Sequence, residues 1–294
     1  MSGAQHPGPV LADLERAAAE HWQAADRAAL GEWLLRAAGG FTGRANSALP
    51  LGDPGMPLGA AVDAVTAWYR SRDLPAMIVV PRPLAQAGTS AHVSAADVSA
   101  ADVSAAGVSA DGPPRVPLDD LLAAREWMIR SGTAVVMTAA IADLPHHGAG
   151  THGAGTRDAG VTVEMASEPG PDWLAIYRYR GQPLPDDALN LLLSAPWQAF
   201  ATVQHDGQAV AVGRVSVAAG WAGITAVEVA ADHRRGGLGT AVTVTLARAA
   251  AERGVNRVFL QVEDGNSAAR ALYARCGFRD AHAYHYRVAP DSGR

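Results

Sequence analysis

The chain has 294 residues, of which 49 % are hydrophobic and 18 % charged, and its formal net charge is −5. It contains no lysine, so its 24 cationic residues are all arginine, which excludes a lysine nucleophile, a Schiff base and a Walker-type lysine. The mild acidity disfavours a nucleic-acid partner, since a dedicated binder carries a basic stripe.

Length and cysteine content narrow the class further. A chain of this length suits one large domain or two ordinary ones. Cys276 is the single cysteine, which excludes an intrachain disulfide and a cysteine-based metal cluster, and we expect no metal site. No run of 18 apolar residues occurs, so we expect no membrane partner. The N-terminus lacks the basic start and apolar core of a secretory signal, so we expect a cytoplasmic protein.

The first half of the chain predicts a mixture of helices and strands. Apolar residues recur near helical spacing over 11–38, and Gly39-Gly40 ends the pattern. The further predicted elements are a helix at 58–71, a strand at Met77–Val80, a helix at 118–130 and a strand at Ala134–Ile141.

Two segments of low complexity interrupt the chain, at 86–115 and at 145–160. The first contains a near-repeat of Val-Ser-Ala-Ala-Asp, and the second duplicates His-Gly-Ala-Gly-Thr. Their small residues bury little area, so both are interpreted as inserts that need not pack. They predict a division into an N-terminal α/β domain, 1–160, and a C-terminal domain, 161–294.

The second half gives clearer patterns. Strands are predicted at Val161–Ala166, Gln198–Gln204, Ala209–Val217, Ile224–Ala230, Val258–Val262 and Tyr284–Val288, and helices around 171–194, at Gly236–Arg253 and at Asn266–Arg275. His205-Asp206-Gly207 is a hairpin turn signal. An antiparallel meander followed by strand–helix–strand–helix–strand predicts a mixed sheet with helices on its faces.

One segment of this half carries a chemical signal. Val227-Glu228-Val229 is followed by the glycine-rich turn Arg234–Thr240, which leads directly into an apolar helix. Such a turn leaves helix N–H groups pointing outward, and the helix dipole adds partial positive charge, so the site suits phosphate oxygens. Two arginines add charge-assisted donors. The glycine spacing fits neither a Walker loop nor a dinucleotide fingerprint.

A second motif follows one helix and one strand later. Asn266–Phe278 reads Asn-x-x-Ala-x-x-Leu-Tyr-x-x-x-Gly-Phe, and Arg234, Gly237 and Gly239 form Arg-x-x-Gly-x-Gly. Together the motifs resemble the GNAT superfamily of acyl-CoA-dependent N-acetyltransferases, over roughly residues 161–290. The first half also resembles a degenerate GNAT domain that lacks the glycine loop, which suggests a tandem arrangement. Taken alone, the glycine motif is also compatible with an ordinary turn. Asn266 alone is compatible with a helix N-cap, and Tyr273 alone with a core aromatic residue.

The resemblance implies a GNAT-type mixed sheet flanked by helices, with acetyl-CoA or coenzyme A as the cosubstrate. The strand at 224–230 would splay from the strand at 258–262, and the pantetheine arm would pair with the backbone between them. The implied cofactor-binding residues are Val227, Val229, Arg234, Arg235, Gly236, Gly237, Leu238, Gly239, Thr240, Asn266 and Tyr273.

Direct transfer to an amine requires an acid and a base. By the resemblance, Tyr273 would protonate the departing thiolate. Glu228 and Glu263 are the acidic candidates for the base, although solvated or structural roles are open for both. The expected partner is a small-molecule amine. The alternatives are a protein amine, and a module that binds acyl-CoA without catalysis.

The remaining candidates concern the acceptor pocket. The loop Gly39–Ser47 is interpreted as a structural turn, with a binding loop as the alternative. His282 and His285 are expected at the surface, with a position bordering the acceptor pocket as the alternative. Four aromatic residues are interpreted equally as pocket or core residues, namely Trp173, Tyr177, Tyr179 and Trp197.

Overall fold

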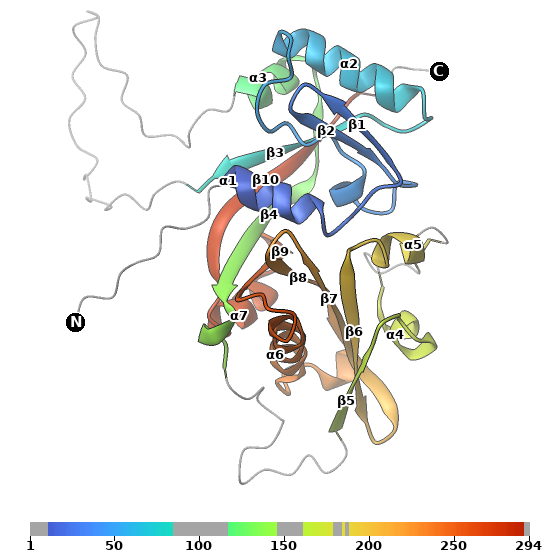
Figure 1. The fold of residues 1–294 in the computed structure, drawn as a ribbon, viewed down its shortest axis with the longest axis vertical. Helices are drawn as coiled ribbons and strands as arrows, with labels where there is room; N and C mark the ends of the chain where they lie inside the picture. The colour runs from blue at the N-terminus through green and yellow to red at the C-terminus, as the bar shows by residue number, and fades with distance from the viewer. Residues whose placement is uncertain (1–10, 85–116, 146–160, 179–183, 186–187, 291–294) are drawn as a thin grey trace, which may run out of the picture.

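A computed structural model describes residues 11–84, 117–145, 161–178, 184–185 and 188–290 (Figure 1). The predicted insert at 86–115 lies outside these ranges, as does all of the insert at 145–160 except Pro145.

The N-terminal part alternates helices and strands. Its elements are α1 (Leu11–Ala19), β1 (Asp26–Leu30), β2 (Trp33–Ala37), a 3-10 turn η1 (Gly43–Ala45), α2 (Leu58–Arg70), β3 (Met77–Pro83), α3 (Pro117–Ala124), β4 (Met128–Ala140) and a 3-10 turn η2 (Ile141–Asp143).

The prediction of one helix over 11–38 was wrong, because α1 ends at Ala19 and β1 and β2 form an antiparallel hairpin. Gly31 makes the turn with φ +56°, and its Cα lies so close to the Pro54 carbonyl that a Cβ would sit 2.3 Å from the carbonyl carbon. Leu34 exchanges backbone hydrogen bonds with Leu49 at 3.1 and 2.8 Å. These long-range contacts override the local helical spacing.

The helix predicted at 118–130 was too long for a similar reason. Glu126 has φ +62°, a left-handed conformation that a continuing helix does not allow. The segment Met128–Arg130 therefore belongs to β4.

The C-terminal part confirms the predicted element types. It comprises β5 (Val161–Ala166), α4 (Pro171–Ile176), α5 (Ala188–Leu192), β6 (Trp197–His205), β7 (Gln208–Ala218), β8 (Trp221–Val229), a 3-10 turn η3 (Ala231–His233), α6 (Leu238–Ala251), β9 (Arg257–Glu263), α7 (Ser267–Arg275) and β10 (Arg279–Val288). The last strand begins at Arg279 rather than at the predicted Tyr284.

One eight-stranded sheet joins the two parts of the chain, in the order β3-β10-β4-β9-β8-β7-β6-β5. β5 to β8 form the predicted antiparallel meander, and β8 runs parallel to β9. β4 comes from the N-terminal part, yet it pairs with β9 through 134–140 and with β10 through 128–138. The predicted division between residues 160 and 161 therefore falls within a shared sheet.

The strand order contains an internal repeat. The series α2–β3–α3–β4 in the first half corresponds to α6–β9–α7–β10 in the second. β10 lies between β3 and β4, and β4 lies between β9 and β10, so each half inserts its last strand beside that of the other (Figure 1). This exchange supports the tandem GNAT arrangement indicated by the sequence.

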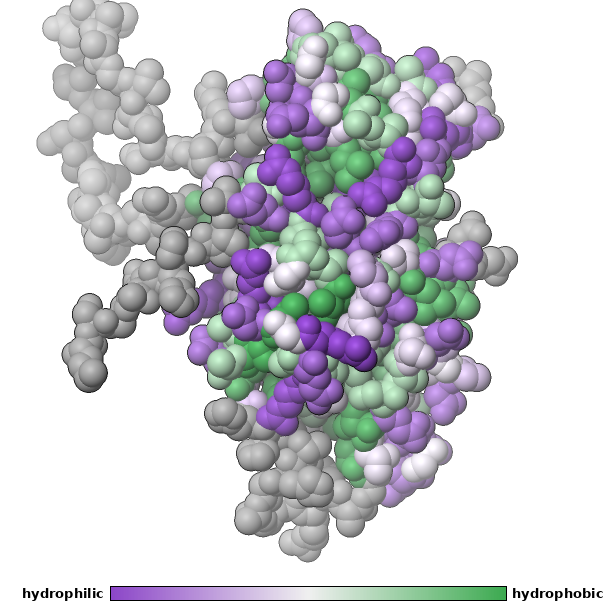
Figure 2. Space-filling view, in the orientation of Figure 1, coloured by the Kyte–Doolittle hydropathy of each residue, from purple (hydrophilic) through white to green (hydrophobic). Residues whose placement is uncertain are grey.

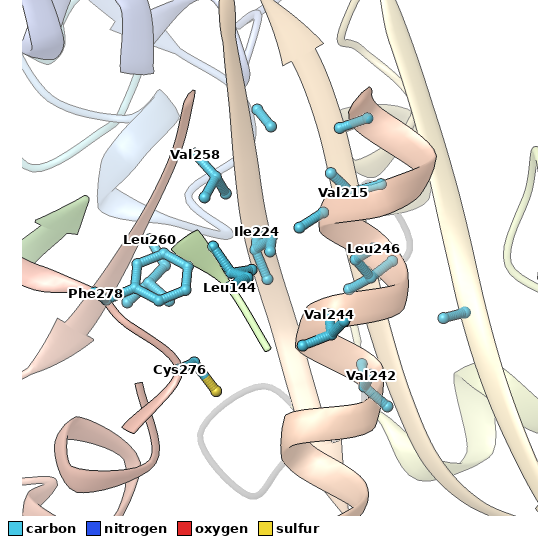
Figure 3. Packing of buried hydrophobic residues seen from close by; sticks show 14 of the residues in the cluster. Leu144, Val215, Ile224, Val242, Val244, Leu246, Val258, Leu260, Cys276 and Phe278 are labelled. Carbon is cyan, nitrogen blue, oxygen red and sulfur yellow. The ribbon is translucent and has the colours of Figure 1, made fainter. Parts of the chain in front are cut away.

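The largest core lies between α6, α7 and the sheet. Ile224 of β8 and Leu260 of β9 face Val244 and Leu246 of α6, with Phe278 packed beside Leu260 (Figure 3). Side chains of a strand alternate between faces, so Phe259, Gln261 and Glu263 lie on the opposite face of β9. That second face is covered by α1 and by the segment that follows β2.

The outer surface is mixed in character. Figure 2 shows hydrophilic residues in a band across the face in view, between the part with α2 and the part with α6. Among the described helices, none is both long and apolar enough to cross a membrane.

The shared sheet predicts that residues 161–294 cannot fold alone. Without β3 and β4, β10 loses both of its neighbours, and β9 keeps only its short parallel contact with β8. We expect this fragment to show no cooperative thermal transition by circular dichroism, while the full chain melts cooperatively. Addition of a separate 1–160 fragment should restore the transition. A sharp transition of 161–294 by itself would contradict the prediction.

Candidate active site

β8 and β9 separate along their length. They pair only through Ala222–Ile224 and Val258–Leu260, although β8 continues to Val229 and β9 to Glu263. Ala226 has φ +56°, and the register with β7 shifts between Val212 and Arg214, so β8 bends where it leaves β9. The result is an unpaired strand edge inside a sheet.

The backbone of Val227 and Val229 faces this edge. The Ala230 N–H donates to the Val210 carbonyl of β7 at 2.8 Å, and successive residues of a strand point their N–H groups to opposite sides. The backbone N–H groups of Val229 and Val227 therefore point away from β7, toward the opening. The Val229 carbonyl accepts instead from Arg234 Nε at 3.1 Å. An extended ligand could pair with this edge as an added strand.

The glycine loop ends beside the same opening. Arg235 has φ +68° and Gly237 φ +84°, and Gly237 is the N-cap of α6 with no side-chain hydrogen bond to the helix start. Within the residues that the structure describes, the backbone N–H groups of the first turn of α6 therefore donate to no N-cap side chain. These groups belong to Leu238, Gly239 and Thr240. Arg234, Arg235 and Gly236 are exposed next to them. This arrangement favours anion binding.

The second motif positions α7 against that loop. Asn266 Oδ1 accepts from the Ala269 N–H at 3.1 Å and so caps α7. Leu272 packs on Gly239, where a Cβ would lie 2.7 Å from its Cδ1. Cys276 Sγ contacts Thr240 Oγ1 at 3.8 Å. The two motifs are therefore in direct contact, and Gly239 permits that contact.

Tyr273 keeps its proton in this environment. Its ring is half-buried and lies 5.9 Å from the ring of Phe278, centroid to centroid. Burial raises the pKa of the phenol to about 12. At neutral pH the hydroxyl is a hydrogen-bond donor, as a general acid requires. The roles assigned to Tyr273 and to the loop residues stay predictions.

A cavity of about 270 Å³ lies on the other face of the sheet, where β9 continues past its pairing with β8. Its lining comes from both halves of the chain: Thr42, Gly43, Arg44, Arg130, Gly132, Thr133, Ala134, Tyr177, Arg178, Gln261, Glu263, Tyr284, His285 and Tyr286. Gln261 and Glu263, in the part of β9 beyond its pairing with β8, place the cavity beside the β8–β9 opening on the face opposite α6.

The two predicted base candidates differ in position. Glu263 lines the cavity and is exposed. Glu228 does not line it, and its Oε2 accepts the backbone N–H of Arg178 at 3.0 Å. Glu228 therefore holds the segment that carries Tyr177 and Arg178 beside the cavity.

The two candidate histidines lie in the protein interior. His282 and His285 are each 1 % exposed, so the expected surface positions were wrong. Neighbouring carboxylates account for this, since the Nε2 atom of His282 lies 2.6 Å from the buried Glu15 Oε1 and that of His285 lies 3.0 Å from the half-buried Asp119 Oδ1. His285 contributes to the cavity lining.

The four aromatic candidates lie in different parts of the structure. Tyr177 lines the cavity, whereas Trp173 is a core residue whose Nε1 donates to the Gly213 carbonyl at 3.1 Å. Trp197 lies at a different surface depression, under the guanidinium of Arg253. Tyr179 lies outside the described residues.

Sequence reasoning missed most of the cavity wall. Arg44 lies in the loop Gly39–Ser47, for which a structural turn was preferred, yet Thr42, Gly43 and Arg44 all line the cavity. The density of glycine and polar donors in this loop was the available signal. Arg130 and Tyr286 gave none, because strand insertion alone brings them here.

A larger cavity, of about 630 Å³, lies beside α1 between Leu34, Leu51 and Trp221. Trp221 begins β8, so this cavity adjoins the end of the strand opposite Val229. It lies at the other end of β8 from the open edge and the glycine loop, so it is not part of the candidate site.

The N-terminal half has a counterpart of the glycine loop, before α2. There the Asp53 N–H donates to Glu32 Oε2 at 2.5 Å, and the Gly55 N–H donates to Asp53 Oδ1 at 2.8 Å. The first turn of α2 has no side-chain cap, as in α6, but these carboxylates lie in the segment just before it, where their charge would repel a phosphate. This charge argues against an anion site before α2.

Comparison with known proteins finds that the chain is similar to acetyltransferases. The family model described as "Probable histone acetyltransferase Rv0428c C-terminal" matches residues 11–137 and 110–287. The chain is 28 % identical over 284 residues to the uncharacterized N-acetyltransferase YobR of Bacillus subtilis (strain 168), covering 94 % of this chain and 97 % of that protein.

Two solved structures are similar in fold. A GCN5-related N-acetyltransferase from Kribbella flavida matches with a TM-score of 0.63 at 16 % identity, over 96 % of each chain. A tandem GNAT protein from the clavulanic acid biosynthesis pathway matches with a TM-score of 0.53 at 17 % identity, over 84 % of this chain and 76 % of its own.

The Gly239–Leu272 contact predicts a packing effect that can be reversed. Gly239→Ala places a methyl group against the end of the Leu272 side chain, which can turn aside, so we expect a loss at the low end of the about 1–3 kcal/mol that is typical of overpacking. Urea unfolding should show the loss, and a second change, Leu272→Ala, should cost less in the Gly239→Ala background than in the wild type. Additive losses would contradict the contact.

Proposed function

Since the chain belongs to the Rv0428c C-terminal acetyltransferase family, and so to the GNAT superfamily of N-acetyltransferases, we propose that it transfers an acetyl group from acetyl-CoA directly to the amine of a small molecule. The proposal depends chiefly on one observation, the uncapped start of α6 beside the open edge of β8.

These two features fit the donor. Coenzyme A is polyanionic and the chain has a net charge of −5, so its phosphates need a local positive site. The first-turn N–H groups of α6, with Arg234 and Arg235, would supply it. The backbone of Val227 and Val229 would hold the pantetheine arm in the β8–β9 opening and offer an N–H group to the developing oxyanion.

The reaction joins the two faces of the sheet. The amine nitrogen attacks the thioester carbonyl carbon, a C–N bond forms, the C–S bond breaks, and the nitrogen loses one proton while the sulfur gains one. Tyr273 would donate a hydrogen bond and then the proton to the departing sulfur. Glu263, on the cavity wall, would accept the amine proton directly or through water, with Glu228 as the second candidate.

Two alternatives remain in view. The family description names a histone acetyltransferase, which would make a protein amine the acceptor. The small cavity walled by both halves favours a small molecule over an extended chain. A non-catalytic acyl-CoA-binding module is the other alternative, and measurement of thiol release across an amine panel separates it, because a binder saturates without releasing thiol.

Ligand binding is tested by thermal shift. At 100 times its dissociation constant, coenzyme A should stabilise the protein by about 2.7 kcal/mol and raise the melting temperature. Arg235→Glu should reduce the shift because it reverses a charge beside the uncapped α6 start. Arg70→Glu, an exposed change at the end of α2, is the matched control and should leave the shift intact. No shift in the wild type would refute the proposed donor site.

Tyr273→Phe tests the proton donor. The variant keeps the ring that packs near Phe278 and loses only the hydroxyl. We expect kcat to fall about 10²-fold or more, within the range for general acid–base catalysis, with little change in the KM for acetyl-CoA. Unchanged kcat in steady-state thiol-release kinetics would remove Tyr273 from the mechanism.

The two glutamates can be ranked by the same assay. Glu263→Gln should lower kcat at neutral pH and partly recover at high pH, where the free amine no longer needs a base. Glu228→Gln keeps an acceptor for the Arg178 N–H, so its effect should be smaller. A larger, pH-reversible loss for Glu228→Gln would exchange their roles.

A further inference from the structure

The cavity wall is positively charged, although the chain as a whole is acidic. Its described lining includes three arginines, Arg44, Arg130 and Arg178, and one carboxylate, Glu263. A cavity of about 270 Å³ lies just below the usual range for ligand pockets, which begins near 300 Å³. It therefore fits a small ligand that brings negative charge.

Arg44 is held in place at this wall. Its Nε donates to Gln261 Oε1, and its guanidinium lies 6.0 Å from the centre of the Trp22 ring. The preceding Gly43 presses on Tyr286, since a Cβ there would lie 2.7 Å from the ring. Asn46 fixes the loop by accepting from the Ala38 and Gly40 N–H groups at 2.7 and 3.0 Å. A rigid arginine binds a carboxylate at little entropic cost.

Arg130 carries a charge that its neighbours do not neutralise. It is half-buried on β4, opposite Tyr286 of β10, and its Nη1 contacts Met77 Sδ at 3.5 Å. Among the described residues, no carboxylate lies within ion-pair distance of it. A thioether is a weak acceptor, so the guanidinium keeps its capacity for a stronger one.

The charges are separated along the cavity. Glu263 lies at the end of β9 that adjoins the β8–β9 opening, where the acetyl group would arrive. Arg44 contacts Gln261, two residues earlier on the same face, which is about 7 Å along the strand. An acceptor bridging these points would present its amine at one end and its anionic group at the other.

We propose, on the basis of the proposed acetyltransferase function, that the acceptor is a small amine that also carries a carboxylate. Its amine binds toward Glu263, and its carboxylate binds to Arg44 and Arg130. Both arginines come from the N-terminal half, so that half sets the acceptor specificity. A lysine-rich peptide is disfavoured because the same guanidinium groups repel its positive charges.

The test compares matched acceptors in a thiol-release assay with acetyl-CoA. The panel contains amino acids and straight-chain amino carboxylates, each paired with its uncharged amide, and a basic lysine-rich peptide. We expect kcat/KM for at least one carboxylate to exceed that of its amide about tenfold or more. The peptide should be a poor acceptor.

Arginine variants assign the preference to the cavity. Arg44→Gln and Arg130→Gln should bring the carboxylate-to-amide ratio toward one, chiefly through KM, and Arg44→Lys should retain part of it. Arg125→Gln is the matched control, because Arg125 pairs with Asp63 on the surface, 2.7 Å away. Circular dichroism melts verify that each variant is folded.

The outcomes separate this inference from the function on which it rests. Equal or faster acetylation of the amides, preference for the peptide, a ratio unchanged in both glutamine variants, or no turnover of the panel while acetyl-CoA still binds would each overturn the acceptor assignment. Loss of acetyl-CoA binding by the wild type would overturn the proposed function itself.

Discussion

The structure depends on the insertion of β4 between β9 and β10. Through 134–140 it continues the sheet from β9, and through 128–138 it supports β10. β10 in turn separates β4 from β3. Because each half supplies a strand that pairs with strands of the other, the two halves are held in a fixed relation.

This constraint also builds the candidate site. The cavity wall combines Arg44 and Arg130, from before residue 145, with Glu263 and Tyr286, from after residue 257. The opening between β8 and β9 has the glycine loop and α6 on one side and the cavity on the other. In the proposed function, the half without a glycine loop thus forms a wall of the acceptor pocket, and the carboxylates of Glu32 and Asp53 lie in the corresponding segment before α2.

The parts that sequence predicted well are those determined locally. The glycine turn at 234–240 and the capped helix at Asn266 depend on residues close in the chain, and so do the strand and helix types after residue 161. The hairpin at 26–37 was read as a helix because Leu49 and Pro54, which fix it, are distant in sequence. Arg130 could not be predicted as a site residue, since its place results from strand insertion alone.

The inserted strand has a consequence for synthesis on the ribosome. β4 is complete at residue 140, but its partner β10 begins only at residue 279. At typical translation rates of about 5–20 residues per second, β4 waits roughly 7–28 s for that partner. During this interval the nascent chain exposes strand edges that the mature sheet covers, and exposed edges of this kind can pair with other chains.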